Sequence, residues 1–162
     1  SGLILGYTMN TKAEEVYRAL IEATAFGTRK IIRSMESNGL TISGCIACGG
    51  LPDKNRLLMQ LFADVTGREF KVCASQLASA LGAAMLGGLA AGSDAGGFDT
   101  LSEASAAMSR LKEESFVPVP EHTKVYARLF AEYERLHDYF GRGENPVMKF
   151  LKGQRSAAIS TE

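Results

Sequence analysis

The first 92 residues alternate between short apolar runs and longer stretches in which apolar residues recur every three or four positions. The apolar runs lie at residues 3–7, 41–48 and 69–74, each bounded by glycine or polar residues. Runs of this length between turn signals predict buried strands. A helical stretch follows each run, so the alternation predicts an α/β fold whose strands are at least partly parallel and joined by right-handed crossovers.

Capping and turn residues place the ends of the first two helices. Thr11-x-x-Glu14 matches a capping box, in which two side chains satisfy each other's free backbone N–H groups. It predicts the start of a long helix, which Asn38-Gly39 ends. The sequence Gly49-Gly50-Leu51-Pro52 predicts a turn before a second helix at residues 55–65, and Gly67 closes that helix.

The second half of the sequence predicts helices and loops. We expect a flexible loop at residues 93–99, a helix at 101–111 behind a capping box at Thr100-x-x-Glu103, a proline-broken linker at 117–122, a helix at 123–139 and a short helix at 147–152. Residues 153–162 are small and polar, which predicts a disordered tail. Residues 1–152 would then form one domain.

A third helix, beginning near residues 75–79, consists largely of alanine and glycine through residue 92. Its apolar run is about 14 residues long, too short to cross a bilayer core of roughly 30 Å as a helix. We therefore expect it to be a buried core helix rather than a membrane span.

The charge balance and the first ten residues bear on the partners and the location of the protein. The chain has 18 basic and 18 acidic residues and a net charge of zero, which gives no electrostatic reason to expect nucleic acid or an anionic membrane as partner. The first ten residues lack the basic and long apolar regions of a secretion signal. A cytoplasmic location is the resulting expectation.

The three cysteines raise the question of redox or metal chemistry. Cys45 and Cys48 form a C-x-x-C motif, but on a strand two residues three apart point to opposite faces, which argues against a thioredoxin-like pair. Cys73 and two histidines complete no four-ligand zinc set with ordinary spacing. We expect buried apolar thiols in a reducing compartment and no metal site.

The most specific local pattern is CGG-LPDKN, a Gly-Gly turn between an apolar strand and a helix. In open α/β sheets ligands bind at this edge, where glycine lets the backbone approach closely and a helix start offers free N–H groups. A Gly-Gly pair alone is more often only a tight turn. It is neither a P-loop nor a dinucleotide fingerprint, because G-x-x-x-x-G-K-[ST] and G-x-G-x-x-G are both absent.

Several segments together resemble the FGGY family of carbohydrate kinases. GG-LPDKNRLLMQLFADVTGREFKV resembles the family's adenosine motif, ALGAAMLGG the segment after it, and residues 1–32 its G-x-x-x-G-x-T strand and first long helix. YARLFAEYERLHDYFGRGENPVMKFLK is similar to the branch that acts on L-ribulose. The resemblance covers nearly the whole chain.

This resemblance implies a fold, a reaction and three site residues. The fold would be a partial actin-like, ribonuclease H-like ATPase domain, a mixed sheet flanked by helices with a C-terminal helical extension. Gly49 and Gly50 would lie against the adenosine and phosphates of ATP, and Asn55 would contact the nucleotide. Some branches have one residue fewer after the glycines, which leaves the register between Lys54 and Asn55 open. Asp64 is expected to cap or pair locally rather than to act as a catalytic acid.

The resemblance also implies what this chain does not supply. In the family the general base and the first phosphate loop, D-x-G-[ST], lie elsewhere in the protein, and phosphoryl transfer with Mg²⁺ needs both walls of the cleft. We therefore expect a C-terminal domain incomplete at its N-terminus, with no catalytic residue of its own, inactive alone and prone to self-association through an uncovered first strand. L-ribulose or a related ketose would bind through the missing domain.

Two rival functions remain open at this point. One is another ketose or polyol kinase of the family, such as a xylulokinase, because most sugar contacts would lie outside this chain. The other is a non-catalytic binding or assembly module that uses the helices at 101–111 and 123–140 as a partner surface. Affinity for a nucleotide separates the second rival from a kinase.

Overall fold

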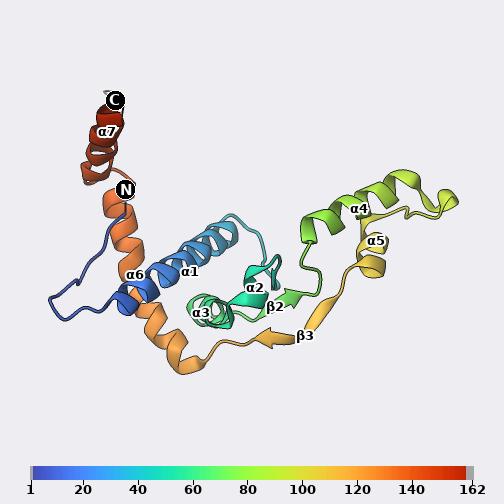
Figure 1. Ribbon diagram of the computed structural model, residues 1–162, viewed down its shortest axis with the longest axis horizontal. Helices are drawn as coiled ribbons and strands as arrows, with labels where there is room; N and C mark the ends of the chain where they lie inside the picture. The colour runs from blue at the N-terminus through green and yellow to red at the C-terminus, as the bar shows by residue number, and fades with distance from the viewer. Residues whose placement is uncertain (1, 160–162) are drawn as a thin grey trace.

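The computed structural model describes residues 2–159 and consists of helices around a small sheet. In chain order the elements are α1 (Ala13–Ser37), β1 (Cys45–Ala47), α2 (Leu51–Lys54), α3 (Arg56–Thr66), β2 (Phe70–Cys73), α4 (Ala78–Ala91), the 3₁₀ turn η1 (Ser93–Ala95), α5 (Leu101–Met108), β3 (Leu111–Phe116), α6 (Pro120–Gly141) and α7 (Val147–Ile159). Figure 1 shows α4 and α5 at one end of the molecule and α7 at the other, with the sheet, α1 and α3 between them. None of the helices in this part of the chain is long and apolar enough to cross a membrane.

The sheet is mixed and has the strand order β1-β2-β3. Strands β1 and β2 are parallel, with Cys45 opposite Phe70 and Ala47 opposite Val72. Helices α2 and α3 form the connection between them, as parallel strands require. The predicted α/β class with a mixed sheet flanked by helices is therefore confirmed.

Helix α3 holds the core together because both of its sides are buried. One side packs against α1 and α6 in a cluster of buried residues: Ala25, Phe26, Leu61, Val65, Tyr126 and Phe130. The other side covers the sheet in a second cluster: Met59, Ala63, Phe70, Val72 and Phe116. Burial of a Phe or Leu side chain contributes roughly 1.5–3 kcal/mol, so these two clusters account for the position of α3 between the helices and the sheet.

The end of α3 follows its predicted signal, whereas the start of α1 differs from the prediction. Gly67 ends α3 in the left-handed conformation at φ +69°. At the start of α1, however, Glu15 rather than Glu14 reaches back, and its Oε2 accepts from the N–H of Lys12 at 2.8 Å. The hydroxyl of Thr11 instead accepts from the N–H of Thr8 at 2.9 Å. Only the half of a capping box made by Glu15 therefore forms, one residue later than predicted, because a lysine side chain has no acceptor.

Residues 3–7 are not a strand, contrary to the prediction. The large apolar side chains among them are between 43% and 67% exposed, and no strand of the described sheet pairs with this segment. A strand needs a neighbour to satisfy its backbone N–H and C=O groups, and an apolar run alone does not supply one.

Strand β3 was not predicted, because its sequence LKEESF carries little apolar alternation. The sequence suggested a helix reaching residue 111 and a linker after it, whereas α5 ends at Met108 and β3 pairs antiparallel with β2. Its position at the sheet edge explains the charges, which are common on edge strands. Two of them form ion pairs with residues before and within α3, Lys112 with Asp53 and Glu114 with Arg56.

Helices α4 and α7 also differ from expectation. Of the described residues of α4, Met85 alone is buried, so the helix is not covered as a core helix within residues 2–159. It packs against α5, and the expected loop after it folds back so that the N–H of Phe98 donates to the carbonyl of Gly88 at 3.0 Å. Helix α7 continues through residues 153–159, where disorder was predicted, and residues 160–162 of that tail lie outside the described residues.

Asp64 links α3 to the start of α6, and it is only 2% exposed. Its Oδ1 accepts from the amide of Gln60 at 2.9 Å, the local contact expected from the sequence. The same oxygen accepts from the N–H of Val119 at 2.8 Å, and Oδ2 lies 2.9 Å from Nδ1 of His122. The carboxylate therefore accepts from a backbone N–H at the start of α6 that lies 55 residues further along the chain.

We expect Asp64→Ala to lower the free energy of unfolding by about 3 kcal/mol, because it leaves the partly buried N–H of Val119 without its charged acceptor. Urea unfolding followed by circular dichroism measures the change. Asp94→Ala, at an exposed position, is the matched control and should change stability by less than about 0.5 kcal/mol. Equal stabilities for the two variants would contradict this account of the α3–α6 link.

Candidate functional site

The candidate site lies where the two parallel strands end. Because β1 and β2 are parallel, their carboxyl ends meet at one edge of the sheet. Cys48 and the Gly49-Gly50 turn follow β1 there, and residues 74–77 follow β2. Ligands of open α/β sheets bind outside this edge.

The two glycines of the turn have different reasons to be glycine. Gly49 has φ +89°, a left-handed conformation that other residues adopt at a cost. Gly50 has φ −81° and ψ −13°, which any residue adopts easily. A Cβ placed at either position meets no described atom within 4 Å. The space beside the turn is thus open, and neither backbone nor packing within residues 2–159 requires glycine at position 50.

Helix α2 is held in place by Asp53, a residue that the sequence did not single out. Asp53 accepts a hydrogen bond from the amide of Gln76 at 2.8 Å and forms an ion pair with Lys112 of β3. The hydrogen bond from Lys112, and then that from Gln76, lower the pKa of the Asp53 carboxyl. These contacts tie the segment after the glycine turn to β3 and to the loop after β2. Sequence analysis missed them because it missed β3.

Asn55, the third predicted site residue, has a structural role in the fold. Its Oδ1 accepts from the N–H of Leu58 at 2.9 Å and caps the start of α3. No hydrogen bond is recorded within the described part of the chain for its amide nitrogen, which leaves that group for a ligand. Its contact with a nucleotide stays a prediction.

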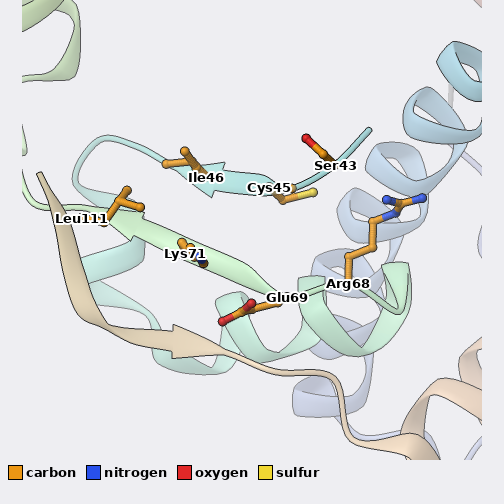
Figure 2. A pocket seen from close by; sticks show the side chains of 8 residues that line it. Ser43, Cys45, Ile46, Arg68, Glu69, Lys71 and Leu111 are labelled. Carbon is orange, nitrogen blue, oxygen red and sulfur yellow. The ribbon is translucent and has the colours of Figure 1, made fainter. Parts of the chain in front are cut away.

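A hollow lies on the sheet (Figure 2), and neither glycine of the turn lines it. Its lining residues are Ser43, Gly44, Cys45, Ile46, Arg68, Glu69, Lys71 and Leu111. Arg68 is already engaged, since it donates to the carbonyl of Ile42 at 2.8 Å and pairs with Glu36. We therefore place the candidate site at the strand ends rather than in this hollow.

The described residues offer no metal centre of their own. Within residues 2–159 there is no group of three or more histidine, cysteine, aspartate or glutamate side chains arranged to hold a metal ion. The chemistry available at the strand ends is binding, through backbone groups, the open space beside Gly50 and the amide of Asn55.

A mixed sheet with an open glycine turn at the ends of its parallel strands is the arrangement at which ligands of open α/β sheets bind. A family model described as the C-terminal domain of the FGGY family of carbohydrate kinases matches residues 1–91. The chain therefore belongs to the FGGY family of carbohydrate kinases.

Relatives and solved structures agree with this assignment. The chain is 58% identical to a ribulokinase of Halalkalibacterium halodurans over 96% of its own length, and 56% identical to a ribulokinase of Geobacillus thermodenitrificans over 98%. It spans only 28% of the length of each. The crystal structure of xylulose kinase from Rhodospirillum rubrum matches 85% of the chain with a TM-score of 0.70 at 28% identity. The matched part is 27% of that kinase. The predicted actin-like ATPase fold is confirmed by these sugar kinases.

Proposed function

We propose that this chain is the nucleotide-binding part of an ATP-dependent kinase that phosphorylates L-ribulose. The observation that carries the proposal is Gly50, a glycine that neither backbone nor packing explains, beside open space at the ligand edge. Two ribulokinases at 56–58% identity over nearly the whole chain support the choice of sugar. A related structure, glycerol kinase from Plasmodium falciparum, was solved with ADP and matches with a TM-score of 0.61 at 27% identity, which supports the nucleotide.

In this proposal the chain binds and positions ATP, while other parts of a longer polypeptide complete the reaction. Gly49 and Gly50 lie against the adenosine and phosphates, and the amide of Asn55 contacts the nucleotide. Bound ATP supplies the γ-phosphate for the terminal hydroxyl of the sugar. Mg²⁺ would arrive with the phosphates of ATP, which are its usual ligands in kinase sites.

The partners and setting follow from the same proposal. ATP and L-ribulose are the ligands, and the protein works in the cytoplasm without nucleic acid or membrane partners. Residues 1–152 act as the C-terminal domain of a complete kinase, by which we mean a polypeptide of the relatives' length that carries this chain. Separated from the rest, the chain associates with itself, because the apolar side chains of residues 3–7 and the free edge of β1 are uncovered.

The test is ATP consumption by the complete kinase with a panel of sugars. We expect kcat/KM for L-ribulose to exceed that for D-xylulose at least tenfold, a transition-state difference of about 1.4 kcal/mol. A preference for D-xylulose or a polyol would favour the other branch of the family. A complete protein that binds no nucleotide and consumes no ATP with any sugar would favour an assembly module instead.

A further inference from the structure

Cys48 and Cys73 lie side by side at the ligand edge. In the parallel ladder Ala47 is opposite Val72, so the next residues in register are Cys48 and Cys73. Neighbouring strands are about 4.7–4.9 Å apart, and a disulfide spans Cα separations of about 4.4–6.8 Å. Residues opposite each other in a parallel ladder point to the same face, so continuing the register by one residue places the two thiols next to each other.

The side chains agree with this register. Burial raises the pKa of the Cys48 thiol, and the neighbouring thiol of Cys73 raises it further. Residue Cys48 is nevertheless exposed at the surface, so a small oxidant can reach it. The C-x-x-C spacing pointed to a different pair.

Cys45 is not part of this pair. It packs against the core cluster beneath the sheet, and burial raises the pKa of its thiol; its charged neighbours are Arg68 and Glu36 rather than another thiol. Cys45 therefore serves as an internal control. Its thiol lies three residues before Cys48, on β1, and should stay outside any bridge.

We propose that Cys48 and Cys73 form a reversible disulfide that weakens nucleotide binding at the Gly49-Gly50 turn. The effect on the nucleotide rests on the proposed function; the bridge itself does not. Cys48 directly precedes Gly49, whose φ of +89° shapes the turn. A bridge needs a Cβ–S–S–Cβ dihedral near 90° and a Cβ separation of about 3.8 Å. Meeting both would rotate Cys48 and move the turn that follows it.

The reaction needs a peroxide as oxidant and balances with it. The thiol of Cys48 first loses its proton, and the thiolate attacks one peroxide oxygen, which breaks the O–O bond and gives a sulfenic acid and hydroxide; the hydroxide takes up the proton to become water. The thiol of Cys73 then attacks that sulfur, the S–O bond breaks, and a second water leaves as the S–S bond forms. Two thiols and one hydrogen peroxide thus give one disulfide and two waters. A dithiol reductant reverses the step, so the bridge is transient in a reducing compartment.

The test uses the complete kinase treated with hydrogen peroxide and then blocked with an alkylating reagent. Trypsin leaves Cys45 and Cys48 together in residues 34–54 and Cys73 in residues 72–110, as the lysine and arginine positions show. We expect a linkage between these two peptides in the wild type and in Cys45→Ser, and its loss in Cys48→Ser and Cys73→Ser. Its absence from the wild type, or its persistence in Cys48→Ser, would overturn the bridge.

ATP affinity of the same samples tests the effect on binding. The oxidised wild type and oxidised Cys45→Ser should bind ATP at least tenfold more weakly than when reduced, and dithiothreitol should restore binding. Oxidised Cys48→Ser should keep the affinity of the reduced protein. A Cys48–Cys73 linkage without a change in ATP affinity would overturn the proposed effect on nucleotide binding. A reduced wild type that binds no ATP would contradict the proposed function, whereas the peptide linkage is read independently of any nucleotide.

Discussion

The 162-residue chain alone should transfer no measurable phosphate from ATP to L-ribulose. Phosphoryl transfer depends on groups placed on both sides of the reacting atoms, and the proposed role of this chain is to bind the nucleotide on one side. A complete kinase should turn over in the usual range of about 1–10³ per second. The isolated chain should lie at least three orders of magnitude below it. A coupled assay for ADP, run on both polypeptides at equal concentration, measures the difference.

Sedimentation of the isolated chain is the control for this assay, because loss of activity through unfolding would be uninformative. We expect a folded species by circular dichroism that associates as its concentration rises, in keeping with the exposed apolar residues 3–7. Turnover by the isolated chain near that of the complete kinase would contradict the proposed division of labour. A strictly monomeric, folded chain at roughly millimolar concentration, where contacts of about 4 kcal/mol are visible, would contradict the self-association.

Replacing Gly50 by valine in the complete kinase should raise the KM for ATP at least tenfold and leave the KM for the sugar nearly unchanged. The backbone at Gly50 suits any residue, and an added Cβ meets no described atom within 4 Å, so the variant should fold normally. The valine side chain would instead occupy the open space that the nucleotide needs. Steady-state kinetics with each substrate varied in turn, together with the melting temperature, measure the effect.

Gly49→Ala provides the matched comparison on the adjacent residue. At φ +89° an alanine is strained, so this variant should lose stability by about 1 kcal/mol or more. Gly49→Ala is therefore expected to lower the melting temperature, whereas Gly50→Val is expected to raise the KM for ATP. A folded Gly50→Val protein with an unchanged KM for ATP would show that the nucleotide does not lie against this turn.

Local signals in the sequence determined the helices and the parallel pair of strands. Gly67 ends α3 as predicted, and the Thr100 and Glu103 side chains form the box that starts α5. The strands predicted at 41–48 and 69–74 contain the shorter β1 and β2. Capping and turn signals involve residues that are only three or four positions apart, so the sequence alone is enough to predict them. The glycine turn was found for the same reason, since strand, turn and helix are consecutive.

Only the tertiary structure decided which segments meet. Residues 3–7 are apolar enough for a strand but have no pairing partner among the described residues, whereas the charged β3 is a strand because β2 lies beside it. The contact of Asp64 with Val119, like the pairing of Ala47 with Val72, joins residues far apart in the chain. Strand pairing and buried hydrogen bonds both need a second segment that lies nearby only after folding. The pattern of apolar and polar residues in one segment does not determine which segment that is.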